Sequence, residues 1–146
     1  IFNSPAFILK KELLMIPIFG WYLKKAGSIS IKRNKISKEN LGFFDDIRKF
    51  INLSNRPIII FPQGTRSSSD DRSSFKKGAN RIYEEFNISC QPIAINSGHT
   101  WPKTGPNKSG KTITVSILRA IKPGLKKGVF LDKLQENIYS ELDTLG

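Results

Sequence analysis

The feature that most constrains this fold is a short apolar run, Ile58–Phe61, with a proline on each side. Three of its four residues are isoleucines, and branching at Cβ favours the extended backbone of a strand. An uninterrupted apolar run is typical of a strand covered on both faces, because a strand with one wet face alternates instead. The run therefore predicts a central strand of a sheet that carries helices on both sides.

Strand-like and helix-like patterns alternate along the rest of the chain. Strands are expected at Ala6–Leu9, Ser28–Arg33, Ile88–Ile95 and Thr112–Ile121, and helices at Glu12–Ala26 with a break at Pro17, Lys38–Leu53, Ala79–Phe86 and Val129–Leu142. Polar loops are expected at Pro62–Ser74 and Asn96–Gly110. Such alternation predicts an α/β fold with a central β-sheet flanked by helices. We expect a single domain over residues 1–146.

The charge of the chain limits the kind of partner it takes. Lys and Arg number 24 against 12 Asp and Glu, which gives a formal net charge of +12. This excess favours a nucleic acid, a phosphorylated small molecule or an anionic membrane surface, and charge alone does not choose among them. The single cysteine, Cys90, excludes an intrachain disulfide and is typical of a cytoplasmic setting.

The segment with the clearest chemistry is Phe61–Ser67, directly after the isoleucine run. Loops that follow strand ends commonly hold ligands in α/β folds. Gly64 permits a tight turn and a close backbone approach, and Arg66 offers a planar cation that matches phosphate oxygens. By composition alone, a solvated surface loop with a turn glycine explains the segment equally well.

The same segment reads Phe-Pro-Gln-Gly-Thr-Arg-Ser and resembles the third sequence block of the glycerolipid acyltransferases related to 1-acyl-glycerol-3-phosphate acyltransferase. Further stretches resemble that family in order and spacing: Lys-Glu-Leu, Ile-Pro and Phe-Gly-Trp within Lys11–Trp21, the second block at Gly27–Arg33, the helix opening at Phe75–Ala79 and the apolar fourth block at Ile88–Ile93. Asn96–Gly98 is most similar to the bacterial branch. The resemblance covers nearly the whole chain and implies the family's α/β acyltransferase fold.

The resemblance also implies an activity. A fatty acyl group would move from a thioester, acyl-CoA or acyl-carrier protein, to the free hydroxyl of lysophosphatidic acid, and the product would be phosphatidic acid. The family requires no metal or bound cofactor for this reaction. Its general base is a histidine in a first block, His-x-x-x-x-Asp, which we expect upstream of Ile1. The one histidine here, His99, is followed at the paired position by Thr104, so we interpret it as a loop residue.

The substrate-binding residues that the resemblance implies are Lys11, Arg33, Gln63, Gly64, Thr65 and Arg66. Arg33 and Arg66 are the leading candidates to bind the substrate phosphate, with a surface ion pair as the alternative. Lys11 is a weaker candidate, because Lys10 beside it is an equivalent cation. Gln63 stands where the family usually has Glu, and its neutral amide can still hydrogen-bond a glycerol hydroxyl.

An apolar stretch from Ile16 to Leu23, followed by Lys24 and Lys25, has two interpretations. It is either part of the core or a surface that enters a lipid interface while the lysines meet anionic head groups. The lipid substrate of the family implies an anionic membrane surface as a partner, at the cytoplasmic face of the cell membrane. A basic nucleic-acid-binding domain and a catalytically inactive phospholipid-binding relative are the alternatives. The former is disfavoured because the basic residues are dispersed and no stacking motif is present, so we expect no nucleic-acid partner.

Overall fold

The structure is a computed structural model that describes residues 4–31, 39–68, 70–102, 104–107, 110, 112–126 and 128–145, with residues 39–41 described by backbone alone. Its contacts divide the chain into two compact units, Ile1–Phe61 and Pro62–Gly146. The expectation of a single domain stays a prediction.

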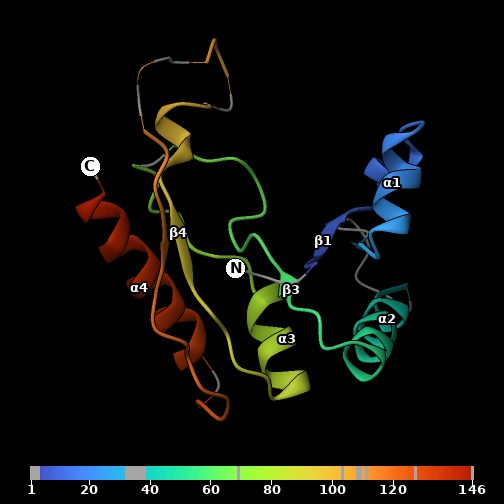
Figure 1. Ribbon diagram of the computed structural model, residues 1–146. Coiled ribbons are helices and arrows are strands. Elements are labelled where there is room, and N and C mark those ends of the chain that lie inside the picture. Colours follow the sequence, from blue (N-terminus) through green and yellow to red (C-terminus); the bar gives the residue numbers. More distant parts are fainter. Residues whose placement is uncertain are drawn as a thin grey trace. The chain divides into compact units, whose positions relative to one another are not determined.

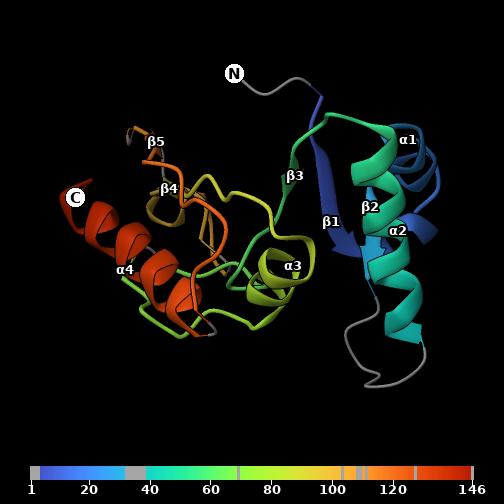
Figure 2. The same cartoon turned by 90° about the horizontal axis from the view of Figure 1, so that it is seen from below.

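The first unit contains a three-stranded parallel sheet in the order β2-β1-β3 (Figure 2). Its elements are β1 (Ala6–Lys10), the 3-10 helix η1 (Lys11–Met15), α1 (Phe19–Lys25), β2 (Ile29–Ile31), α2 (Glu39–Leu53) and β3 (Ile58–Ile59). Lys10 is in register with Ile31, and Phe7 with Ile59. Among the described strands of this sheet, β1 is therefore central, and the prediction that the isoleucine run is central was wrong. That run is also shorter than expected, and both of its strand residues are half-buried.

The expected helix after β1 is divided in two. Pro17 and Ile18 separate η1 from α1, and Ile18 has a φ of 64°, which an isoleucine rarely adopts. Gly27 follows α1 with a φ of 71°, so the chain turns where the sequence predicted the helix to stop.

The core of the first unit is formed by buried residues of its sheet and of α2, which packs against β2; Figure 1 labels α2 and β1. Ala6 and Ile29 of the sheet are buried, as are Phe43 and Ile47 on one face of α2. Arg56, just before β3, fixes the start of the sheet to the turn after α1. Its Nε donates to the Ser4 carbonyl at 2.5 Å, and its Nη2 donates to the Ala26 carbonyl at 2.6 Å.

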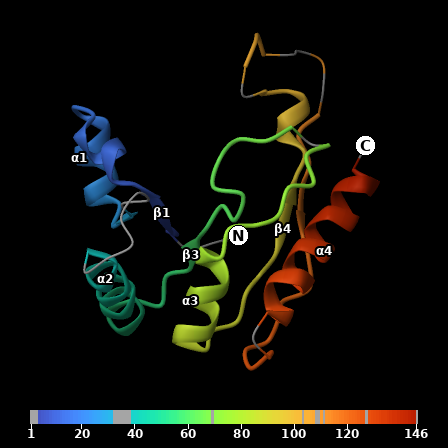
Figure 3. The same ribbon diagram turned by 180° about the vertical axis from the view of Figure 1, so that it is seen from behind.

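In its described part, the second unit combines α-helices with a two-stranded antiparallel sheet (Figure 3). Its elements are α3 (Gly78–Phe86), β4 (Ile93–Ile95), the 3-10 helix η2 (Ser97–His99), β5 (Val115–Ile117) and α4 (Val129–Thr144). β4 and β5 pair antiparallel, with Ala94 in register with Ser116. Outside the regular strands, Cys90 and Ile121 form one more bridge, so the predicted strands Ile88–Ile95 and Thr112–Ile121 are only partly regular.

The core of this unit contains one pair of stacked aromatic rings and one buried, hydrogen-bonded amide. Tyr83 of α3 stacks on Phe130 of α4 at 3.8 Å between ring centroids. Asn96 is buried after β4; its Oδ1 accepts from the Thr114 N–H at 2.7 Å, and its Nδ2 donates to the Leu145 carbonyl at 3.3 Å. The amide therefore joins the two strands to the end of α4. Overall, the predicted mixed α/β class with a parallel sheet and flanking helices is confirmed, although the strands divide between two sheets.

Candidate functional site

The predicted ligand loop is a tight, irregular turn that begins at Pro62. Gly64 has a φ of 73°, in the left-handed region that favours glycine, as the sequence predicted. Gln63 and Gly64 are half-buried, whereas Thr65 and Arg66 are exposed. The Lys76 N–H donates to the Pro62 carbonyl at 2.8 Å and closes the segment into a loop. The structure thus brings four predicted site residues together on one loop, with the arginine facing solvent.

Side chains of α4 hold this loop in place. The Tyr139 hydroxyl donates to the Ser73 carbonyl at 2.5 Å, and the Phe75 N–H donates to Gln135 Oε1 at 3.0 Å. The ring of Tyr139 packs edge-on against that of Phe75, with centroids 5.1 Å apart. The loop is therefore anchored to α4 at its end, through Ser73 and Phe75.

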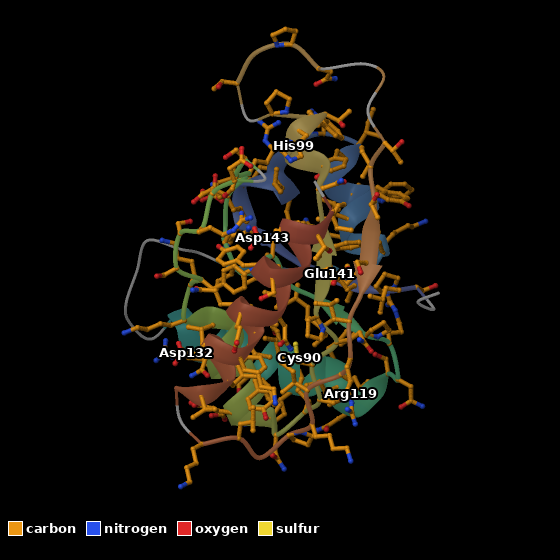
Figure 4. All side chains as sticks on the ribbon, turned by 90° about the vertical axis from the view of Figure 1, so that its left-hand side faces the viewer. Cys90, His99, Arg119, Asp132, Glu141 and Asp143 are labelled. Carbon is orange, nitrogen blue, oxygen red and sulfur yellow. The ribbon has the colours of Figure 1, made fainter. Side chains whose placement is uncertain are left out.

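Arg72 adds a charged contact to the same helix. Its guanidinium lies 5.1 Å from the centre of the Tyr139 ring and forms an ion pair with Asp143. Figure 4 places Asp143 near the carboxyl-terminal end of α4, beyond Glu141. A cation at this end of a helix also matches the negative end of the helix dipole.

The electrostatics of the loop favour an ionised Asp71 and a neutral Tyr139. The Ser73 backbone N–H donates to Asp71 Oδ1 at 2.8 Å and is the largest cause that lowers the pKa of this carboxyl; the Ser73 hydroxyl adds to it. Burial raises the pKa of Tyr139, and the Asp71 charge raises it further. Tyr139 is therefore a protonated hydrogen-bonding group at neutral pH.

The remaining predicted binding residues come from the first unit. Lys11 opens η1 directly after β1 and is exposed. Because Lys10 is in register with Ile31, the carboxyl ends of β1 and β2 open at the same edge of the sheet. Arg33, two residues after β2, lies outside the described residues.

His99 belongs to η2 in the second unit and is half-buried. Figure 4 shows it at one end of this unit, with Arg119 toward the other. The interpretation of His99 as a loop residue and not the base stays a prediction; the structure places it at the end of η2, and Thr104 in the following loop is exposed. Within the described parts of the chain, no three His, Cys, Asp or Glu side chains form a group that could hold a metal ion.

The apolar stretch from η1 to α1 is exposed to a large extent. Ile18 is 84% exposed, Trp21 61% and Tyr22 64%, and Met15 at the end of η1 is also exposed. Lys25 lies 4.3 Å from the centre of the Trp21 ring, so a cation borders the aromatic surface. We call Met15, Ile18, Phe19, Trp21 and Tyr22 the α1 apolar face. Among the described helices, none is both long and apolar enough to cross a membrane.

The sequence profile of the family described as Acyltransferase matches residues 2–96, well over half of the chain. The chain belongs to this acyltransferase family. The matched segment of the chain contains β1 to β4 and the whole Gln63–Arg66 turn, whereas α4 lies beyond it.

Curated relatives give the comparison more detail. The chain is 34% identical over 114 residues to "1-acyl-sn-glycerol-3-phosphate acyltransferase" of Pseudomonas aeruginosa, covering 75% of this chain and 42% of that protein. It is 30% identical over 141 residues to the protein of the same name from Helicobacter pylori, covering 95% of this chain and 59% of that protein. The chain thus spans about half the length of the curated relatives it matches, at 42% and 59%.

A solved structure supports the fold. The crystal structure of the 1-acyl-sn-glycerophosphate (LPA) acyltransferase PlsC from Thermotoga maritima superimposes with a TM-score of 0.76 at 22% sequence identity. The match covers 98% of this chain and 57% of that chain. The acyltransferase fold expected from the sequence is therefore confirmed.

Sequence reasoning did not identify Gln135, Tyr139 and Asp143 as supports of the loop. They lie on α4, 60 to 71 residues away in sequence from their partners, so local motifs contain no sign of the contact. One signal was present: Tyr139 follows the apolar stripe residue Ile138, and a buried tyrosine hydroxyl requires a hydrogen-bond partner.

Proposed function

We propose that this chain forms the acceptor-binding part of an enzyme that acylates 1-acyl-glycerol-3-phosphate and produces phosphatidic acid. The observation that carries the proposal is the glycine turn with its exposed arginine, Gly64 to Arg66, inside the segment that matches the acyltransferase family. The names of the Pseudomonas and Helicobacter relatives support the same acceptor. Neither the family match nor these relatives favours the nucleic-acid-binding alternative.

In this proposal Arg66 binds the phosphate of the acceptor. An exposed guanidinium next to a left-handed glycine can present a planar pair of N–H donors to phosphate oxygens. Thr65 adds a hydroxyl and Gln63 an amide to the same loop. Lys11 and Arg33 are proposed as further phosphate-binding cations.

The chemical step is the attack of the acceptor hydroxyl oxygen on the carbonyl carbon of an acyl thioester. The new C–O ester bond forms as the C–S bond breaks, and the hydroxyl proton passes through a general base to the leaving thiol. Acyl-CoA and acyl-carrier protein both supply such a thioester. We propose that the base is a histidine with an acidic partner from a segment outside residues 1–146, because His99 has no carboxylate at the paired position.

We also propose that the α1 apolar face rests on an anionic membrane surface, at the cytoplasmic face of the cell membrane. Exposed aromatic and aliphatic groups can enter the boundary between head groups and acyl chains. Lys24 and Lys25, in the last turn of α1, can meet the anionic head groups beside it. Membrane contact would bring the loop to a lipid acceptor.

The test is an acyl-transfer assay on the protein expressed from its complete reading frame. Radiolabelled acyl-CoA and, separately, acyl-carrier protein are supplied with lysophosphatidic acid, and the lipid products are separated by thin-layer chromatography. We expect labelled phosphatidic acid, and little label in glycerol 3-phosphate or lysophosphatidylcholine offered as alternative acceptors. Equal use of lysophosphatidylcholine would contradict the phosphate-binding role. No transfer with either donor would favour the inactive phospholipid-binding alternative.

A further inference from the structure

Two successive backbone amides at the end of the predicted ligand loop are held by different partners. The Phe75 N–H donates to Gln135 Oε1 on α4 at 3.0 Å. The next amide, the Lys76 N–H, donates to the Pro62 carbonyl at 2.8 Å. That carbonyl belongs to the peptide bond between Pro62 and Gln63, so the bond orients the peptide plane from which the turn begins. A short series of contacts therefore leads from Gln135 to the start of the glycine turn.

Tyr139 holds the same segment one helical turn further along α4. Gln135 and Tyr139 are four residues apart, so their side chains leave the same face of the helix, about 6 Å apart along its axis. Tyr139 donates to the Ser73 carbonyl at 2.5 Å, and two residues of chain span at most about 7 Å between Ser73 and Phe75. The spacing of the two side chains thus matches that of the two backbone groups, and α4 holds the segment at two points.

The burial of Phe75 makes this attachment difficult to replace. Its side chain is 4% exposed, and its ring packs edge-on against that of Tyr139, with centroids 5.1 Å apart. Gln135 is half-buried. A backbone N–H in such surroundings has little access to water, so it depends on the oxygen of Gln135 for its hydrogen bond.

We propose that Gln135 is a positioning residue for acceptor binding: by holding the end of the loop, it holds the turn that presents Arg66 to the acceptor phosphate. The inference rests on the proposed function, and it adds a residue from beyond the segment 2–96 that matches the acyltransferase family. In this role Gln135 does not touch the acceptor. A bidentate contact between guanidinium and phosphate requires a defined geometry. An exposed side chain two residues after a glycine with a φ of 73° therefore needs a loop whose backbone is held.

The variant Gln135→Met tests the role, because it keeps the length of the side chain and removes the amide oxygen. On the protein from its complete reading frame, we expect the KM for lysophosphatidic acid to rise roughly fivefold with kcat changed less than about twofold, since binding of the acceptor is weakened. The KM for the acyl donor should not change. Exchange of the Phe75 amide hydrogen should become roughly tenfold faster, because its acceptor is lost.

Two further variants separate the hydrogen bond from other effects of the substitution. Gln135→Glu keeps an acceptor oxygen at the same reach, so its acceptor KM should stay within about twofold of the wild-type value. Gln135→Asn carries the same amide on a stem that is shorter by one CH₂ group, so it should resemble Gln135→Met. A Gln135→Glu variant as impaired as Gln135→Met would overturn the inference. An unchanged acceptor KM in both Gln135→Met and Gln135→Asn would overturn it as well.

Ser116→Ala is the matched control, because it removes a hydrogen bond between α4 and a different segment. The Ser116 hydroxyl donates to Glu141 Oε1 at 2.5 Å, and both residues are half-buried. The melting temperature should fall about as much as in Gln135→Met, without a change in the acceptor KM or in the exchange of the Phe75 amide. An equal rise of the acceptor KM in Ser116→Ala would overturn the inference, because a general loosening of α4 would then explain the result.

A double variant shows whether Gln135 acts through Arg66. If it does, Arg66→Ala/Gln135→Met should have the same acceptor KM as Arg66→Ala alone. Effects that multiply would overturn the inference. A wild-type protein that fails to acylate lysophosphatidic acid would refute the proposed function instead. The exchange of the Phe75 amide in Gln135→Met would still decide whether Gln135 holds the loop, and unchanged exchange would overturn the inference in either case.

Discussion

Arg56 lies directly against Gly27, so closely that a Cβ atom added to the glycine would be 2.8 Å from Arg56 Nη1. The same guanidinium donates to the Ala26 carbonyl one residue earlier, and Gly27 itself has a φ of 71°. The turn after α1 is therefore shaped by two requirements at once: a left-handed backbone and space for a cation.

Gly27→Ala should lower the stability of the first unit by more than the strain of a positive φ, which is about 1–2 kcal/mol. The additional loss comes from displacing Arg56 and its hydrogen bonds. Gly124→Ala is the control, because Gly124 has a φ of 94° and nothing within 4 Å of the added Cβ. Thermal unfolding of both variants measures the difference. Equal losses would show that the Arg56 contact contributes nothing.

Arg66→Ala should reduce kcat/KM for lysophosphatidic acid roughly 10- to 100-fold, because a charge-assisted contact to phosphate contributes about 1.5–3 kcal/mol. The melting temperature should change little, since Arg66 is exposed. His99→Ala serves as the comparison and should retain nearly full turnover. Acyl transfer that survives Arg66→Ala would refute the phosphate-binding role, and loss of turnover in His99→Ala would make His99 a candidate base.

Trp21→Ser should weaken binding to vesicles of phosphatidylglycerol and phosphatidic acid roughly tenfold, because a large aromatic group no longer enters the interface. Trp101→Ser is a matched control, since Trp101 is 62% exposed and Trp21 is 61% exposed. Vesicle co-sedimentation at low and high salt measures both variants. Higher salt should weaken wild-type binding if lysines beside the α1 apolar face contribute. Equal losses in the two variants would refute this face as the membrane surface.

Cys90 should be slow to react with iodoacetamide at pH 8. Burial raises the pKa of its thiol from 9.0 to about 11, so the reactive thiolate should be roughly 100-fold scarcer than in the unfolded chain. Because the folded pKa is the higher one, the stability linked to this group is complete below pH 9.0 and is lost as pH rises toward about 11. Alkylation followed by mass spectrometry, with and without guanidinium chloride, measures the ratio. Comparable rates in both conditions would contradict the burial.

The local elements could be predicted from the sequence because each has a local cause. Gly27 and Gly64 stand where the backbone needs a positive φ, and both do adopt one. The helices at Gly78–Phe86 and Val129–Thr144 follow apolar periodicity to within two residues of the expected ends. The break at Pro17 was also visible, because proline interrupts helical hydrogen bonding.

The strand order, the irregular strand and the supports of the loop were not predicted, because each depends on pairing between residues far apart in the sequence. The isoleucine run looked central because strand composition reports burial, not strand order; within the described sheet it pairs with β1 alone. The beginning of the predicted strand Ile88–Ile95 is irregular; before β4, Cys90 forms only an isolated bridge with Ile121. The supports of the loop were missed for the same reason, since Tyr139 bonds Ser73 from 66 positions away in the sequence.

The distance between the ligand loop and α4 along the chain has a consequence during synthesis. The ribosome completes Ser73 well before Tyr139, and translation adds roughly 5–20 residues per second, so the loop waits seconds for the helix that anchors it. Until then, the Ser73 carbonyl and the Phe75 N–H lack their partners on α4. We therefore expect the predicted ligand loop to be among the last parts of the second unit to reach its final shape, and a ribosome that pauses before α4 to prolong the exposure of this loop to proteases and chaperones.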